Sequence, residues 1–151
     1  MMAIAYGSVY VAQIAIGANP AQAVRVFHEA ESFHGPSLIL AYSTCIAHGI
    51  DMGSSMSHQK ELVKSGFWPL FRYDPRQAHQ GLQPFHLDSH APSLPFRDIA
   101  MQEARFAMLA QAQPEHAAEL LALAQKDIDD TWHWYEQLAK VEREYSENPA
   151  P

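Results

Sequence analysis

Cys45 is the single cysteine of the chain and the side chain with the most reactive chemistry. A thiolate is a nucleophile and a ligand for soft metals, but it forms only beside a base or in a positive field. His48 follows three residues later and is a candidate base, although spacing within a loop does not fix geometry. Because a free cysteine usually behaves as a small apolar side chain in a core, the residue type alone favours a buried, unreactive thiol.

Two histidines with a carboxylate between them form a second candidate group. His86 and His90 have the H-x3-H spacing of half a zinc site, with Asp88 between them. Pro84 and Pro92 bracket the segment and disfavour a helix, so the two imidazoles are not expected to share a face. A zinc hydrolase is one interpretation, and we prefer the other, in which both histidines lie on the surface.

Two further groups have structural and functional interpretations. Residues 132–135 (Trp-His-Trp-Tyr) suit either an aromatic binding platform or a helix that docks on its neighbour. Docking is preferred, because on a helix these side chains point in several directions. His58 and Glu61 lie three residues apart and are expected to form a solvated pair of little energetic weight.

The first half of the chain predicts the elements that position Cys45. Residues 9–16 and 37–42 are nearly continuous apolar runs, which indicate strands covered on both faces. Between them, Asn19-Pro20 begins a helix with an apolar stripe, and Gly35-Pro36 ends it. A strand, a helix and a strand with short joints predict a parallel βαβ unit. Residues 43–49 then follow the carboxyl end of a strand, where ligands usually bind in open α/β sheets.

The second half predicts a helix over 54–65, a strand over 68–73, and a Pro-rich wrapping segment to residue 95 with an extended piece at 85–87. Helices are expected over 97–112 and 114–145, the second with an apolar seam. We therefore expect an α/β fold with an incomplete parallel sheet, followed by a helical pair. Residues 1–95 form the α/β part, 96–145 the helices and 146–151 a disordered tail. Because sheets usually have about 5–6 strands, the chain is expected to be part of something larger.

Composition excludes several classes of protein. A net charge of −7 without a cluster of Lys or Arg argues against nucleic-acid binding and against an anionic membrane surface. No apolar run approaches the roughly 20 residues that span a bilayer, and no basic n-region begins the chain. With one cysteine and no internal disulfide, a cytoplasmic protein is expected.

Several longer runs resemble pyruvate:ferredoxin (flavodoxin) oxidoreductases, in the order in which that family has them. The matching runs are residues 6–13, 29–33, 35–49, 65–75, 84–89, 103–109 and 124–127. They resemble the closing part of the family's thiamine-diphosphate domain and cover the chain from about residue 1 to residue 140. Several motifs in register are far more specific than one short pattern.

The resemblance implies an enzyme of the EC 1.2.7 class that oxidatively decarboxylates pyruvate to acetyl-CoA and carbon dioxide. Electrons pass through [4Fe–4S] clusters to ferredoxin or flavodoxin, and thiamine diphosphate with Mg²⁺ carries the carbon chemistry. It also implies that Cys45 is the fourth thiolate of a [4Fe–4S] cluster, with Thr44, Ile46 and His48 around it as residues that tune the cluster. The implied partners are the remainder of the oxidoreductase chain, the electron acceptor, pyruvate, coenzyme A and a second copy in a homodimer.

The departures from the family are equally specific. The thiamine motif, a Gly-Asp-Gly followed by an Asn-bearing loop, and the other cluster cysteines are absent from this sequence. Met1 is therefore expected to mark a truncation, an internal start or one part of a split gene, and no catalytic residue is expected here. His86 and His90 stand where relatives are expected to have Gln and Lys. The alternative to an inactive part of an oxidoreductase is an autonomous α/β interaction module that docks through its last helix.

Overall fold

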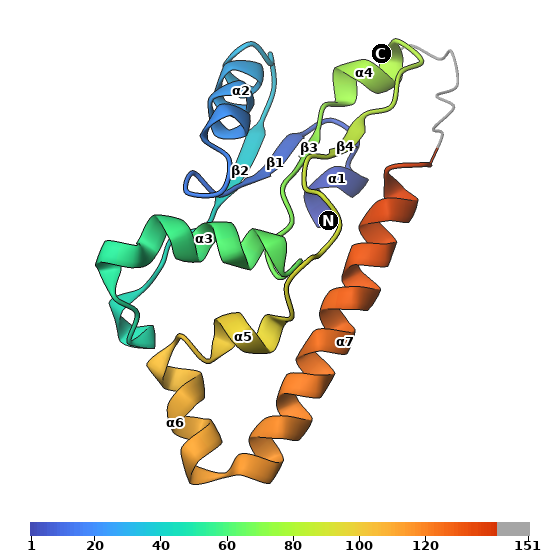
Figure 1. The fold of residues 1–151 in the computed structure, drawn as a ribbon. Helices are drawn as coiled ribbons and strands as arrows, with labels where there is room; N and C mark the ends of the chain where they lie inside the picture. Colours follow the sequence, from blue (N-terminus) through green and yellow to red (C-terminus); the bar gives the residue numbers. More distant parts are fainter. Residues whose placement is uncertain (142–151) are drawn as a thin grey trace.

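The computed structural model describes residues 1–141, and Figure 1 shows the order of its elements. The strands are β1 (Tyr10–Ile14), β2 (Ser37–Ala41), β3 (Phe71–Tyr73) and β4 (Phe85–Leu87). The helices that precede β4 are α1 (Met2–Ala5), α2 (Pro20–Glu31), α3 (Ser55–Lys64) and α4 (Pro75–His79). The helices that follow it are α5 (Phe96–Ala100), α6 (Ala104–Ala112) and α7 (Pro114–Leu138).

The four strands form one mixed sheet in the order β2-β1-β3-β4. β1 and β2 pair in parallel across the α2 crossover, which confirms the βαβ prediction and the α/β class. β3 is antiparallel to β1, and β4 is antiparallel to β3. The expectation of a parallel sheet is therefore wrong for its second half. The reason is that α3 lies beyond the carboxyl ends of β1 and β2, so the chain re-enters the sheet from that end.

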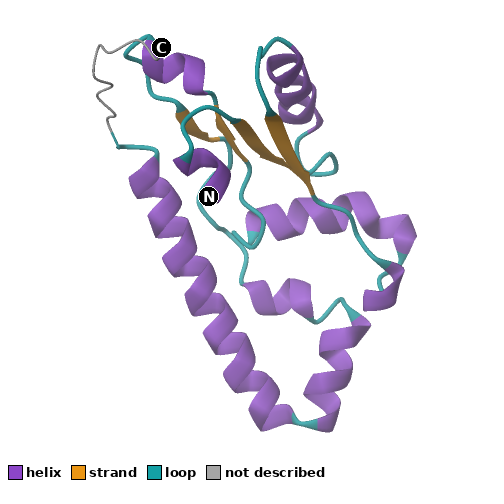
Figure 2. Cartoon of the chain, turned by 180° about the vertical axis from the view of Figure 1, so that it is seen from behind, coloured by secondary structure: helices purple, strands orange, loops and turns teal. Residues whose placement is uncertain are grey.

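Strand β1 is covered on both faces, as its continuous apolar run predicts. Val11 points to one face, into a cluster that α1, β3, β4 and α7 complete. Tyr10, Ala12 and Ile14 point to the other face and pack on α2. Every residue of β1 is buried, so this strand is the centre of the core. Figure 2 shows α2 and α7 on either side of the sheet.

Strand β2 is mostly exposed, so the prediction that it is buried is wrong for this chain. Leu38 is 45% exposed and Leu40 is 37% exposed, although both lie in an apolar run. Within the described residues β2 pairs only with β1, which leaves its other edge without a strand partner. The physical reason is that α2 packs over β1, and no described element extends past β2 to cover it.

The helix that connects β1 and β2 begins where the sequence predicts. The Asn19 side chain accepts a hydrogen bond of 2.9 Å from the Gln22 backbone N–H, and Pro20 occupies the first turn. The helix buries Ala23 and Val26, whereas Phe27 is 54% exposed and does not belong to the buried stripe. Its apolar face is therefore narrower than the pattern predicts.

The predicted helix over 97–112 is two helices, because the chain turns at residues 101–103 between α5 and α6. Glu103 is the N-cap residue of α6, makes no side-chain capping bond and is buried. The wrapping segment contains the predicted extended piece as β4, and it also contains α4, which the pattern does not predict. The break therefore places Glu103 directly before the first residue of α6.

The last helix packs on the rest of the molecule through the predicted seam. Ala117, Ile128 and Tyr135 are buried, as expected, but Thr131 is exposed and Trp132 is buried in its place. In the described part, α7 ends at Leu138. The predictions that the helix continues to residue 145 and that 146–151 form a disordered tail lie outside the described residues.

Candidate functional site: the loop after strand β2

The loop that carries Cys45 leaves the sheet at the carboxyl end of β2. The Tyr42 backbone N–H still donates to the Ile14 carbonyl at 3.0 Å, and the chain then leaves the strand. Ile46–His48 form a short 3-10 turn that ends at Gly49. Cys45 is exposed, so the thiol is not the buried, unreactive one that the residue type alone favours.

The loop is fixed to the body of the protein on both sides of Cys45. Before it, the Thr44 hydroxyl lies 2.6 Å from the Ser55 hydroxyl at the start of α3, and Thr44 is buried. After it, Gly49 has φ +70° and lies directly against Ala104, where any Cβ would collide with the Ala104 side chain. Cys45 is therefore an exposed side chain on a well-anchored loop, which suits a residue that must hold a ligand in one position.

Glu103 brings two histidines together behind this loop. One carboxylate oxygen lies 2.8 Å from His48 Nδ1, and the other lies 2.9 Å from His58 Nε2. The Glu103 and His58 side chains are 5% and 2% exposed, while His48 is 36% exposed at the surface. The prediction of a solvated His58–Glu61 pair is wrong, because α3 turns His58 inward and Glu61 contacts Gln102 instead.

The negative charge of Glu103 acts on the adjacent aromatic group. Burial raises the pKa of Tyr42, and the charge of Glu103 raises it further. Tyr42 also packs edge-on against Trp68, with ring centroids 5.3 Å apart. Local residue patterns do not single out Glu103; the only available signal is a carboxylate within an apolar stretch.

An open hollow lies beside His48, with a cavity volume of about 480 Å³. Ile46, Met108, His48 and Arg105 are among the residues that line it. Ile46 is 74% exposed and Met108 is 68% exposed, so apolar side chains surround the loop on its outer side. The hollow therefore combines an imidazole, a guanidinium group and uncovered apolar side chains, and Cys45 directly precedes its first lining residue, Ile46.

The other histidine candidates do not meet. His86 Nε2 in β4 lies 2.7 Å from the Gln77 side-chain oxygen, and His90 is exposed beyond the strand. Within residues 1–141, no group of three or more His, Cys, Asp or Glu side chains is arranged to hold a metal ion. The described residues therefore do not form a complete metal site, and Cys45 is the one thiol that the sequence offers.

The aromatic run on α7 divides between two roles. Trp132 and Tyr135 are buried, and the Tyr135 ring lies 5.3 Å from that of Phe71 on the sheet. His133 and Trp134 are exposed on the opposite side of the helix. The docking interpretation is confirmed for the two buried residues.

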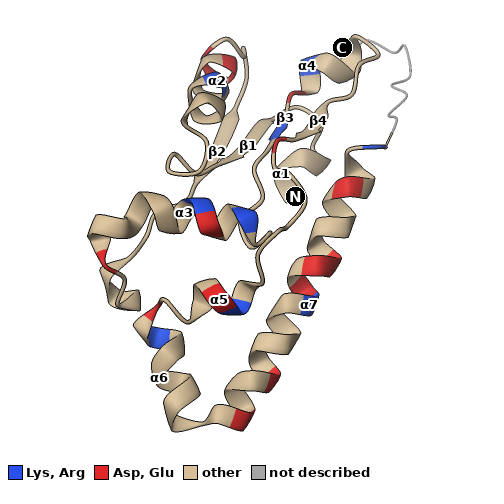
Figure 3. Ribbon diagram, viewed as in Figure 1, with Lys and Arg blue, Asp and Glu red and all other residues tan. Residues whose placement is uncertain are grey.

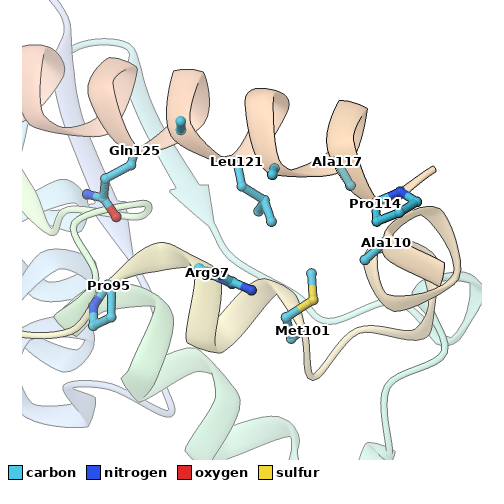
Figure 4. A pocket seen from close by; sticks show the side chains of 10 residues that line it. Pro95, Arg97, Met101, Ala110, Pro114, Ala117, Leu121 and Gln125 are labelled. Atoms are coloured by element: carbon cyan, nitrogen blue, oxygen red, sulfur yellow. The ribbon is translucent and has the colours of Figure 1, made fainter.

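A second hollow, between α5 and α7, lies apart from these candidates. Figure 4 shows Arg97 and Met101 facing Leu121 and Gln125 across it, and its cavity volume is about 380 Å³. The amide of Gln125 is already engaged, because its oxygen accepts from the Phe96 backbone N–H at 2.8 Å. The walls are mainly apolar, and no predicted site residue lines this hollow.

The surface charges are scattered rather than concentrated. Figure 3 shows Lys and Arg distributed along the described elements, with acidic residues interspersed along α7. None of the helices in residues 1–141 combines the length and the apolar character that crossing a bilayer would require. In the described part, neither surface charge nor hydropathy indicates a binding surface other than the loop after β2.

Comparison with known proteins finds several close relatives for almost the whole chain. It is 48% identical over 92% of its length to a pyruvate-flavodoxin oxidoreductase of Nostoc. It is 47% identical over 94% of its length to a protein of the same name in Trichormus variabilis. It is 44% identical over 93% of its length to a pyruvate:ferredoxin oxidoreductase of Moorella thermoacetica. The chain spans about 12% of the length of each of these relatives. It matches no protein-family model.

Proposed function

Because the chain belongs to the pyruvate:ferredoxin/flavodoxin oxidoreductase family over a segment equal to about 12% of its relatives' length, we propose that it works as one part of such an enzyme. The reaction converts pyruvate and coenzyme A to acetyl-CoA and carbon dioxide. Two electrons leave through [4Fe–4S] clusters to ferredoxin or flavodoxin, and one proton is released. The segment alone is inactive in this proposal, because the thiamine and pyruvate sites lie mainly outside it.

The contribution of this chain is one ligand of an iron–sulfur cluster, supplied by Cys45. A [4Fe–4S] cluster needs four thiolates, and this sequence contains one cysteine. The observation that carries the proposal is the exposure of that thiol on a loop anchored on both sides, at the carboxyl end of a strand. The other three ligands come from another part of the polypeptide.

The neighbours of Cys45 have distinct places around such a ligand. Thr44 is turned inward and holds the loop to Ser55, so its hydroxyl acts on the loop rather than on the cluster. Ile46 is exposed beside the thiol and is suited to exclude water, which lowers the polarity around a bound cluster. His48 directs Nδ1 to Glu103 and leaves its other ring nitrogen toward the outer hollow.

The uncovered strand β2 supports the view that the sheet continues in another part of the enzyme. Its apolar side chains and unpaired edge need a partner that the described residues do not supply. In this arrangement residues 1–95 form the second part of the thiamine-diphosphate domain, and helices α5, α6 and α7 pack on it. We place the assembled enzyme in the cytoplasm as a homodimer, with Mg²⁺ and thiamine diphosphate bound mainly outside this chain.

The test is pyruvate oxidation by the complete oxidoreductase polypeptide, with and without this segment. With thiamine diphosphate, Mg²⁺ and coenzyme A, the complete polypeptide is expected to reduce flavodoxin or ferredoxin in the presence of pyruvate. The polypeptide without the segment is expected to lose that reduction. Unchanged reduction without the segment would contradict the proposal and favour the autonomous interaction module.

A further inference from the structure

We propose that Glu103 is a positioning residue that acts through the ring of His48 and fixes the loop that carries Cys45. The proposal rests on the proposed function for what Cys45 binds, an iron–sulfur cluster. The position of the loop does not depend on the proposed function. No motif singles out this residue, and its role follows from the contacts of its two carboxylate oxygens.

Glu103 is a buried carboxylate with one imidazole nitrogen beside each of its oxygens. A carboxylate with a 5% exposed side chain has little access to water, so its charge must be balanced by hydrogen-bond donors. His48 Nδ1 at 2.8 Å and His58 Nε2 at 2.9 Å are the ring nitrogens within reach of its two oxygens. A carboxylate oxygen only accepts, so the tautomers that satisfy Glu103 have the proton on Nδ1 of His48 and on Nε2 of His58. One charge thus fixes two imidazole rings at the same time.

The two histidines tie the loop to different parts of the molecule. His58 lies on α3 and is 2% exposed, so it gives the carboxylate a rigid support from the interior. Glu103 itself stands at the break between α5 and α6, and Ala104 next to it lies against Gly49. His48 is the only one of the three residues that belongs to the loop. The carboxylate is therefore the link between the loop and the helices behind it.

The ring of His48 controls Cys45 through a short path of backbone. The His48 N–H donates to the Cys45 carbonyl at 3.0 Å, and the Gly49 N–H donates to the Ile46 carbonyl at 2.9 Å. These bonds close one tight turn over residues 45–49, so the backbone of His48 is bonded directly to that of Cys45. Holding the His48 ring therefore holds the direction in which the Cys45 side chain leaves the loop.

Substitution of His48 by Asn or Gln distinguishes a positioning role of the ring from a chemical role of the imidazole. The side-chain nitrogen of Asn can occupy the place of His Nδ1, and that of Gln the place of His Nε2. His48→Asn therefore keeps a donor to Glu103, whereas His48→Gln does not. Glu103→Gln keeps the shape but loses the charge and one acceptor. Glu61→Gln is the matched control, because Glu61 contacts Gln102 and neither histidine.

The first measurement is hydrogen exchange of the backbone amides of residues 44–49, made on the complete oxidoreductase polypeptide that contains this segment. Amides of β1 serve as the internal reference for folding. Exchange in the loop is expected to be about tenfold faster in Glu103→Gln and His48→Gln, because a charge-assisted bond is lost. His48→Asn and Glu61→Gln are expected to match the wild type. Equal exchange in His48→Asn and His48→Gln, or unchanged exchange in Glu103→Gln, would overturn the proposal.

The second measurement separates this inference from the proposed function. The electron paramagnetic resonance spectrum of the reduced enzyme is expected to change in Glu103→Gln and to stay as in the wild type in Glu61→Gln, the matched control. A change of equal size in both variants would show that the effect does not come from the contacts of Glu103 with the histidines and would overturn the inference. If Cys45→Ser leaves iron content and spectrum unchanged, the proposed function fails, while the exchange result still decides the role of Glu103.

Discussion

Strands β1 and β2 lie side by side in parallel register, yet their surroundings are opposite. Val11 pairs with Leu38, and Gln13 pairs with Leu40. Every residue of β1 is buried, whereas β2 is exposed except for Ile39, which is half-buried. Both strands come from nearly continuous apolar runs of the kind that predicts burial on two faces.

The difference shows that an apolar strand pattern reports the surroundings of the complete protein, not of one chain. β1 obtains its cover from α1, α2, β3 and α7 in the described residues, whereas β2 does not. The Cys45 loop leaves the sheet from this uncovered strand. In the proposed enzyme, a partner that covered β2 would also lie near the loop that carries the thiol, which links the incomplete sheet to the proposed cluster.

Loss of the Arg72 ion pairs, which join α2 and the segment after β4 to β3, is expected to lower the free energy of unfolding most. Arg72 on β3 bonds both oxygens of Asp88, at 2.8 and 2.9 Å, and Glu29 on α2 at 2.7 Å. Arg72→Met leaves two partly buried carboxylates without their cation and is expected to lower the free energy of unfolding by about 3–5 kcal/mol. Urea unfolding followed by circular dichroism measures this. A loss similar to that of an exposed pair, such as Lys126→Met, would show that the network does not hold α2 to the sheet.

A matched pair of substitutions compares the two strands directly. Ile14 is fully buried in β1, and Ile14→Ala is expected to cost about 2–5 kcal/mol through lost contacts and a cavity. Leu40 is 37% exposed in β2, and Leu40→Ala in this chain is expected to cost less than about 1 kcal/mol. Urea unfolding of both variants gives the difference.

The same two substitutions can be compared in the complete polypeptide, by their cost in the free energy of unfolding. There, Leu40→Ala is expected to approach the cost of Ile14→Ala, because the partner would cover β2. Equal small costs for Leu40→Ala in the chain and in the complete polypeptide would show that β2 remains uncovered and would remove this support for the proposed sheet.

At the loop, Gly49→Ala is expected to cost about 1–2 kcal/mol. The residue has φ +70°, which is strained for a side chain, and its Cβ would meet that of Ala104. Gly81→Ala is the matched control, with φ +71° and open space around the added Cβ. A greater loss of stability for Gly49→Ala than for Gly81→Ala is the result expected from the close approach of the loop to α6. Equal losses would show that only the backbone conformation matters.

The smallest effect concerns pH on the covered side of β1. Burial raises the pKa of Tyr10, and its 2.8 Å hydrogen bond to Glu29 raises it further. Because the folded state favours the protonated phenol, this stabilisation is complete below the unfolded pKa of about 10 and is lost as pH rises above it. A loss of about 1.4 kcal/mol per pH unit is expected from this group. Tyr10→Phe is expected to flatten the alkaline limb of a stability–pH curve; an unchanged limb would contradict the assignment.

Local patterns in the sequence predict much of the fold and part of the site. The Asn19-Pro20 start of α2, the parallel pairing of β1 with β2, and the short strand β4 all follow from residue type and spacing. The family resemblance, not the residue type, directs attention to Cys45 and gives it a function. The exposed thiol agrees with that interpretation.

What the sequence does not predict depends on contacts between distant segments. At the break before α6, Glu103 turns inward to residues 55 and 45 positions earlier in the chain, a pairing that no local pattern reveals. The same contacts bury His58, which helical spacing places in a solvated pair. The antiparallel direction of β3 depends on where α3 ends in space, and the exposure of β2 depends on which elements are absent beside it in the described residues.

In the proposed function, Cys45 supplies one ligand of an iron–sulfur cluster whose other ligands lie elsewhere in the oxidoreductase. The most direct measurement is iron content together with the electron paramagnetic resonance spectrum of the complete polypeptide, with Cys45 and with Cys45→Ser. The substitution is expected to lower the iron content, to alter the spectrum and to slow electron delivery to the acceptor. An unchanged iron content with an unchanged spectrum would contradict the proposed function.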